Sequence, residues 1–157
     1  MALRMKCSRC WGMGAAVAIW ALLLPIALAS GRDGTIEELK ERVANAGIGD
    51  RPSLCIEISE RRLDEADRLY VAGDSEKAQG SLVDVTAFAE LARDYAIQSH
   101  KHEKQSEIAI RKMTRKLANL KHAVAHEDQQ PIQDVIDHLQ RIRDDLLAAM
   151  FPHGVKK

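Results

Sequence analysis

Apolar residues recur every three or four positions along most of the chain after residue 34, which is the spacing of one helix face. No segment shows the strict alternation of apolar and polar residues that is typical of a half-buried strand. The pattern therefore predicts an all-α protein.

A short first helix is expected at Thr35. Thr35 and Glu38 have the spacing of a capping box, in which the threonine side chain accepts from the backbone at Glu38 and the glutamate reaches back. Gly47 should end this helix, because glycine readily adopts the left-handed conformation that follows a helix.

The second helix should begin with Pro52, since proline suits the first helical position, and should run to about Ala72. Gly73 then stops it, and Asp74 is the expected N-cap of a third helix. Helices two and three should therefore form an antiparallel hairpin with a tight turn.

A heptad pattern can be followed from Leu82 to Val124, with a polar interruption between Ser99 and Ser106. No glycine or proline occurs between Ser81 and Gln130, so a single helix from about Ser75 to Val124 is expected, roughly 75 Å long. The repeating positions hold Leu82, Val85, Ala89, Ala92, Ala96, Ser99, Glu103, Ser106, Ile110, Met113, Leu117, Leu120 and Val124.

The fourth helix should begin with Pro131, after a polar turn around Asp128 and Gln129, and fold back over the second half of the long helix. Its stripe consists of Ile132, Val135, Ile136, Leu139, Ile142, Leu146 and Met150. Two antiparallel hairpins that share one long helix are therefore predicted, with the polar segment 98–105 uncovered. If that segment bends, the alternative is a compact four-helix bundle.

Residues 1–29 have the layout of a secretory signal peptide. Three basic residues precede an uncharged, mostly apolar run, and Ala27 and Ala29 provide the small residues expected before a cleavage site at Ser30. The helical domain would then be residues 30–157, outside the cytoplasm. Because the apolar run can be interpreted as longer than usual, the alternative is an uncleaved N-terminal membrane anchor.

Cys7 and Cys10 form a C-x-x-C pair, but they lie in the segment expected to be removed and lack further ligands nearby. Cys55 would be the single thiol left, and its place on a helical stripe predicts a buried side chain rather than an intermolecular disulfide. The first 29 residues contain three of the 23 basic residues and none of the 23 acidic ones, so the remainder carries a formal charge of −3. That balance favours neither nucleic acid nor, once the signal is cleaved, a membrane surface.

His122 and His126 are the candidate metal ligands, because residues four apart on a helix share a face and can chelate one ion. No third histidine is expected beside them. His100 and His102 are two apart, so on a helix they point in different directions and should be solvated.

Basic residues dominate 101–121, and the expected fourth helix carries Asp134, Asp137, Asp144 and Asp145. Pairing between them inside the hairpin is the simpler interpretation, and an acidic partner or anionic surface is the alternative. The small residues Ala89, Ala92 and Ala96 are expected to be core rather than a dimer seam, and a homodimer is a separate hypothesis.

Known catalytic motifs are absent: the sequence has no nucleophile elbow, phosphate-binding glycine loop, zinc-protease motif or covalent haem signal. We therefore expect that the protein is not an enzyme and that it binds no cofactor. The sequence predicts an exported, non-catalytic interaction or scaffold protein whose partner is another protein or a second copy. The alternative function is a small extracytoplasmic metal-binding or metal-sensing bundle.

Overall fold

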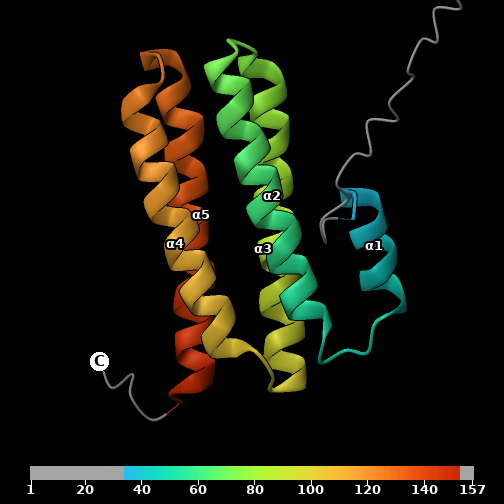
Figure 1. Cartoon of the computed structure of the whole chain (residues 1–157). Helices are drawn as coiled ribbons and strands as arrows, with labels where there is room; N and C mark the ends of the chain where they lie inside the picture. Colours follow the sequence, from blue (N-terminus) through green and yellow to red (C-terminus); the bar gives the residue numbers. More distant parts are fainter. Residues whose placement is uncertain (1–33, 153–157) are drawn as a thin grey trace, which may run out of the picture. The chain divides into compact units, whose positions relative to one another are not determined.

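The computed structural model describes residues 34–152, which contain five helices and no strand, so the all-α prediction is confirmed. The expected signal peptide, with Cys7 and Cys10, lies outside these residues. The helices are α1 (Ile36–Asn45), α2 (Arg51–Val71), α3 (Ser75–Ser99), α4 (Glu103–Ala123) and α5 (His126–Met150) (Figure 1). None of these five helices is both long and apolar enough to cross a membrane.

The capping box at the start of α1 forms as predicted. The Glu38 backbone N–H donates to the Thr35 hydroxyl at 3.2 Å, and the Thr35 N–H donates to Glu38 Oε2 at 2.9 Å. α1 packs on α2, where its residues Leu39 and Val43 are buried. The capping box therefore fixes where α1 begins, and the two apolar residues attach it to the next helix.

The turn between α2 and α3 also follows the prediction. Pro52 lies in the first turn of α2, and Gly73 adopts a φ of 80°, a conformation that only glycine reaches without steric cost. Asp74 then caps α3 by accepting from the Lys77 N–H at 3.4 Å.

The predicted continuous helix from Ser75 to Val124 is wrong, because the chain breaks between α3 and α4. His100 and His102 have φ values of 53° and 62°, in the left-handed region. Histidine is enriched there relative to most residues, so a helix can end at a histidine without glycine or proline. The structure agrees with the alternative, in which the polar segment bends and the helices pack as a compact bundle.

α5 begins at His126, five residues before the predicted start at Pro131, which lies inside the helix. The buried Asp128 explains the difference, because its carboxylate accepts from the Ser75 hydroxyl at 2.8 Å and from Gln79 Nε2 at 3.3 Å. These contacts with α3 hold the first turn of α5 in place ahead of the proline.

Packing between helices gives a bundle of α2, α3, α4 and α5. α2 packs along α3 and α4 along α5, while α3 also contacts α5 and α2 contacts α4 (Figure 1). The helices that meet across the two pairs run in the same direction: Ser75 and Asp128 join the starts of α3 and α5, and Arg93 and Asp145 join them farther along. The segment that links α3 to α4 must therefore cross from one side of the bundle to the other.

Most heptad positions identified in the sequence are buried in the core, the exceptions being Ser99, Glu103 and Val124. Ala89, Ala92 and Ala96 are fully buried, which confirms them as core rather than an exposed dimer seam. Cys55 is also a free, fully buried thiol, as predicted. Burial raises its pKa to about 11, with the nearby Arg51 opposing the shift, so the thiol stays protonated at neutral pH.

Candidate functional site

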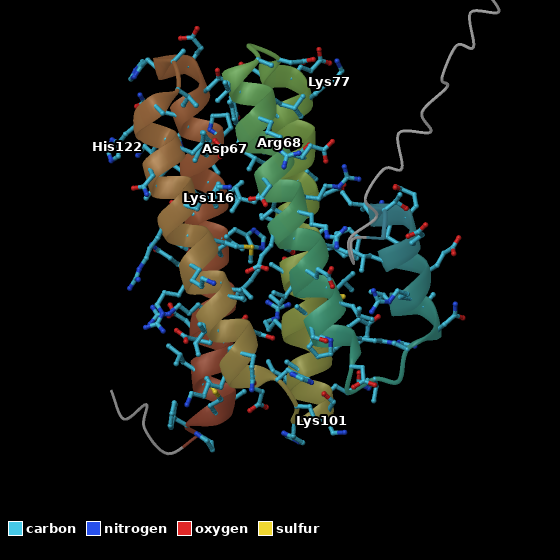
Figure 2. The ribbon with its side chains drawn as sticks, in the orientation of Figure 1. Asp67, Arg68, Lys77, Lys101, Lys116 and His122 are labelled. Carbon is cyan, nitrogen blue, oxygen red and sulfur yellow. The ribbon has the colours of Figure 1, made fainter. Side chains whose placement is uncertain are left out.

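The two histidines expected to share one helix face lie on different helices. His122 is in the last turn of α4, whereas His126 is the first residue of α5. Val124 and Ala125 between them are extended, so the helical spacing that motivated the metal prediction does not exist. Both histidines are exposed, and Figure 2 shows His122 pointing away from the neighbouring helices.

Within residues 34–152, no group of three or more His, Cys, Asp or Glu side chains is placed to hold a metal ion. Metal binding by His122 and His126 stays a prediction. Zinc bound to the folded state would raise the melting temperature by mass action, and His126→Ala should remove that gain.

His100 and His102 were predicted to be solvated helical residues, but they form the link between α3 and α4. His100 is exposed, with Nδ1 3.6 Å from Glu103 Oε1, and His102 is half-buried at the N-cap of α4. The side chain of His102 makes no capping hydrogen bond. The link is thus held in an unusual backbone conformation with few local bonds.

The basic residues of α4 do not pair with the acidic residues of α5, so that expectation is wrong. Lys116 Nζ instead lies 2.6 Å from Asp64 Oδ1 and 3.4 Å from Asp67 Oδ2, both on α2 (Figure 2). Partial burial lowers the pKa of Lys116, but its hydrogen bonds and charge attraction to the two carboxylates outweigh this and raise the pKa overall. The two ion pairs of Lys116 therefore join the two hairpins. Inside the α4–α5 hairpin the charges pair in the reverse sense, with Arg143 of α5 beside Glu107 of α4.

The acidic side chains of α5 are engaged elsewhere. Asp145 Oδ2 lies 2.9 Å from Arg93 Nη1 on α3, and the half-buried His138 of α5 lies 2.6 Å from Glu90 of α3. Among the described residues, no carboxylate lies within ion-pair distance of three exposed cations on α4, Lys104, Lys112 and Arg115. The outward side of α4 is thus a basic, solvated surface.

The outward side of α3 is different, because four exposed positions on it are apolar, and the neighbouring acids Asp84 and Glu90 are paired with Arg62 and His138. We call Gly80, Val83, Ala87 and Leu91 the α3 face; all four are exposed, Val83 to 66% and Leu91 to 38%. A helix that is apolar on both sides is normally buried on both sides. The α3 face is therefore the strongest candidate for a binding surface on the described helices.

A shallow groove between α3 and α5 borders the α3 face. It has a volume of about 330 Å³, and Val83 belongs to both surfaces. Its lining is Gln79, Leu82, Val83, Thr86, Pro131, Asp134, Val135 and His138. Half of this lining is apolar, and the polar side chains come from both helices, Gln79 and Thr86 from α3 and Asp134 and His138 from α5.

Sequence reasoning missed the α3 face, although the signal was present. Positions 80, 83, 87 and 91 are spaced by three or four residues and lie opposite the buried heptad positions of the same helix. The heptad pattern accounts only for the apolar stripe that forms the core, and the second apolar stripe lies on the other side of the helix.

The buried carboxylate of Asp128 is the remaining cluster of interest. Tyr70 lies near it: burial raises the pKa of the Tyr70 phenol, and the Asp128 charge raises it further. The Tyr70 hydroxyl is buried without a hydrogen-bond partner in the structure. Since Asp128 is already satisfied by Ser75 and Gln79, the cluster serves to join the two turns at this end of the bundle.

No protein-family model, curated protein or solved structure matches this chain. The α3 face and its groove are therefore interpreted from their own geometry.

Proposed function

We propose that this chain is an exported, non-catalytic interaction module that binds a helix of another protein against the α3 face. The observation that carries the proposal is the exposure of Val83 and Leu91 on a helix whose opposite side is fully buried. Burial of apolar surface contributes about 25 cal/mol per Å², so covering this face would be favourable.

The shape of the surface favours a helical partner. A groove between two parallel helices accepts the apolar stripe of an amphipathic helix, whose contacts recur every three or four residues. The groove lies between α3 and α5 and contains Val83, Val135 and Pro131. A partner helix with residues spaced in that way would contact both walls.

The charges around the surface favour a partner with basic flanks. Glu76, Asp94 and Asp134 are exposed on α3 and α5. Neither Glu76 nor Asp134 lies within ion-pair distance of a cation in the described residues, although Asp134 accepts from Gln130 at 2.8 Å. Lysine or arginine beside the partner's apolar stripe would complement these carboxylates and speed association.

A photo-crosslinking amino acid at position 83, in the full chain produced in an exporting host, tests this proposal. One discrete protein adduct is expected, and Leu91→Glu should abolish it because a charge on the face opposes burial. The same crosslinker at Val71, which is 85% exposed on α2, provides the matched control. Equal adducts from both positions, or an adduct indifferent to Leu91→Glu, would count against the α3 face.

Export is tested separately by the intact mass of the recovered protein. A chain that begins at Ser30 supports cleavage of the signal peptide, whereas a chain that retains residues 1–29 supports the anchored alternative.

A further inference from the structure

We propose that residues His100–His102 are a hinge through which two copies of this chain exchange their α4–α5 hairpins. In the exchanged dimer, α3 and α4 continue as one helix, and each α2–α3 hairpin packs against the α4–α5 hairpin of the other copy. This proposal does not rest on the α3 face.

The link in the monomer is strained and poorly capped. Two of its three residues have positive φ without being glycine, which disfavours L-amino acids. Of the five helices in residues 34–152, only α3 lacks a backbone hydrogen bond from its C-cap residue. Straightening the link would remove both left-handed residues and allow the missing helical bonds to form.

The sequence of the link is compatible with a continuous helix. No glycine or proline occurs from position 81 to 130, and the heptad phase of α3 continues through Ser99, Glu103 and Ser106 into Ile110. A helix from Ser75 to Ala123 would be roughly 75 Å long. The link therefore has two accessible conformations, and the broken one is held by contacts between the hairpins.

The middle of the straightened helix would be uncovered in the dimer, and its composition suits that exposure. Residues 98–105 are all polar or charged, and the His100 side chain is 86% exposed even in the monomer. Straightening consequently exposes little apolar surface at the hinge itself.

Every contact between the hairpins can be remade between copies, because exchange leaves each hairpin unchanged. Besides the shared apolar core, these contacts are Lys116 with Asp64 and Asp67, His138 with Glu90, Arg93 with Asp145, and Asp128 with Ser75 and Gln79. A second copy is the partner whose surfaces match them. Short, strained hinge loops are known to favour such exchange.

The first test compares glycine and alanine at the hinge of the full chain. His100→Gly with His102→Gly relieves the strain of the broken link and disfavours the straight helix, so the dimer fraction should fall. His100→Ala with His102→Ala keeps the strain of the broken link and favours the straight helix, so the dimer fraction should rise. The dimer dissociation constants of the two variants should differ by about 100-fold or more, because each dimer contains two hinges.

Sedimentation equilibrium after refolding at high protein concentration measures this difference, since exchange requires the hairpins to separate first. Both variants should fold, because the substitutions lie in a polar link outside the core, and circular dichroism checks this. Equal dissociation constants for the two variants, or a chain that stays monomeric in both and in the wild type, would overturn the hinge.

The second test distinguishes exchange from side-by-side association. One variant carries Asp64→Lys and Asp67→Lys, and the other carries Lys116→Asp, so each monomer contains like charges where an ion pair was. Refolding them together should favour the heterodimer, because exchange gives two bundles that each contain opposite charges. Formation of homodimers and heterodimers in statistical proportion would contradict exchange.

Leu91→Glu separates this inference from the proposed function. It should abolish binding at the α3 face and leave the exchanged dimer unchanged, since Leu91 neither lines the groove between the hairpins nor takes part in the contacts named above. A dimer lost on Leu91→Glu would be an α3-face dimer, and the hinge proposal would be wrong.

Discussion

The α2–α3 hairpin packs a helix of mainly small buried side chains, α3, against a helix with large ones, α2, whereas both helices of the α4–α5 hairpin contribute large side chains. α3 presents mainly small side chains to the core, and α2 and α3 share the most extensive packing of any helix pair. The buried residues of α3 are Ala78, Ser81, Leu82, Val85, Ala89, Ala92 and Ala96, whereas those of α4 and α5 include Ile110, Met113, Leu117, Leu120, Ile132, Ile136, Leu139, Ile142 and Leu146. Side-chain size sets how closely two helices approach, so the hairpins should respond to opposite substitutions.

The buried polar contacts of the two hairpins show the same difference. In α2–α3, the Ser59 hydroxyl reaches the backbone carbonyl of Val85 on the facing helix at 3.1 Å. In α4–α5, the carboxylate of the buried Glu107 is met by the long side chain of Arg143, with Nε 2.8 Å from Oε1. A short side chain is sufficient where the helices are close, and a long one is used where the core is filled by larger residues.

The largest effect is expected from truncation in the α4–α5 hairpin. Leu139 is fully buried, so Leu139→Ala should lower the free energy of unfolding by about 3 kcal/mol through lost burial and a residual cavity. Urea denaturation measures the change. Ile108→Ala on α4, where the side chain is 37% exposed, should cost well under half as much; similar losses at both positions would mean that the core is not where the structure places it.

Enlargement should have the next largest effect, this time in the α2–α3 hairpin. Ala92 is fully buried between closely packed helices, so Ala92→Leu should destabilise by about 2–3 kcal/mol through overpacking. The matched control is Ala87→Leu on the exposed side of the same helix, which should be nearly neutral. If Ala92→Leu proved neutral, the close approach of α2 and α3 would be disproved.

The sequence predicted the parts of this fold that depend on local chemistry. The capping box at Thr35, the turn at Gly73 and the buried small stripe from Ala89 to Ala96 all follow from short-range rules, and all are present. Each is determined by residues within a few positions, so no knowledge of distant contacts was needed.

The errors arose where distant residues decide the local structure. The break at His100–His102 lacks glycine and proline, and it forms because the hairpins pack against each other. The start of α5 at His126 depends on Asp128 contacting α3, some 50 positions away in the sequence. The helical spacing assumed for His122 and His126 is absent for the same reason, because the turn separates them, and metal binding there stays a prediction.

The pH dependence of stability should reveal the buried thiol of α2. Burial raises the pKa of Cys55 from 9.0 to about 11, so the unfolded chain loses this proton at lower pH than the folded protein. Stability therefore falls as pH rises from 9 to 11, by about 2 kcal/mol from this group. Lysines and tyrosines also titrate there, so the measured quantity is the difference in slope between the wild type and Cys55→Ala; identical slopes would mean that the thiol is accessible to water.

The smallest effect tests whether a single hydroxyl reports how closely α2 and α3 approach. Ser59→Ala removes the hydrogen bond to the Val85 carbonyl and should cost about 1 kcal/mol, which the higher helix propensity of alanine partly offsets. Ser53→Ala on the same helix removes an exposed hydroxyl that bonds its own turn, to the Asp50 carbonyl at 2.8 Å, and includes the same propensity gain. The difference between the two substitutions therefore isolates the contact between helices. If Ser59→Ala were no more destabilising than Ser53→Ala, the hydroxyl would not hold the hairpin together, and close packing of the alanines would have to account for the whole of its stability.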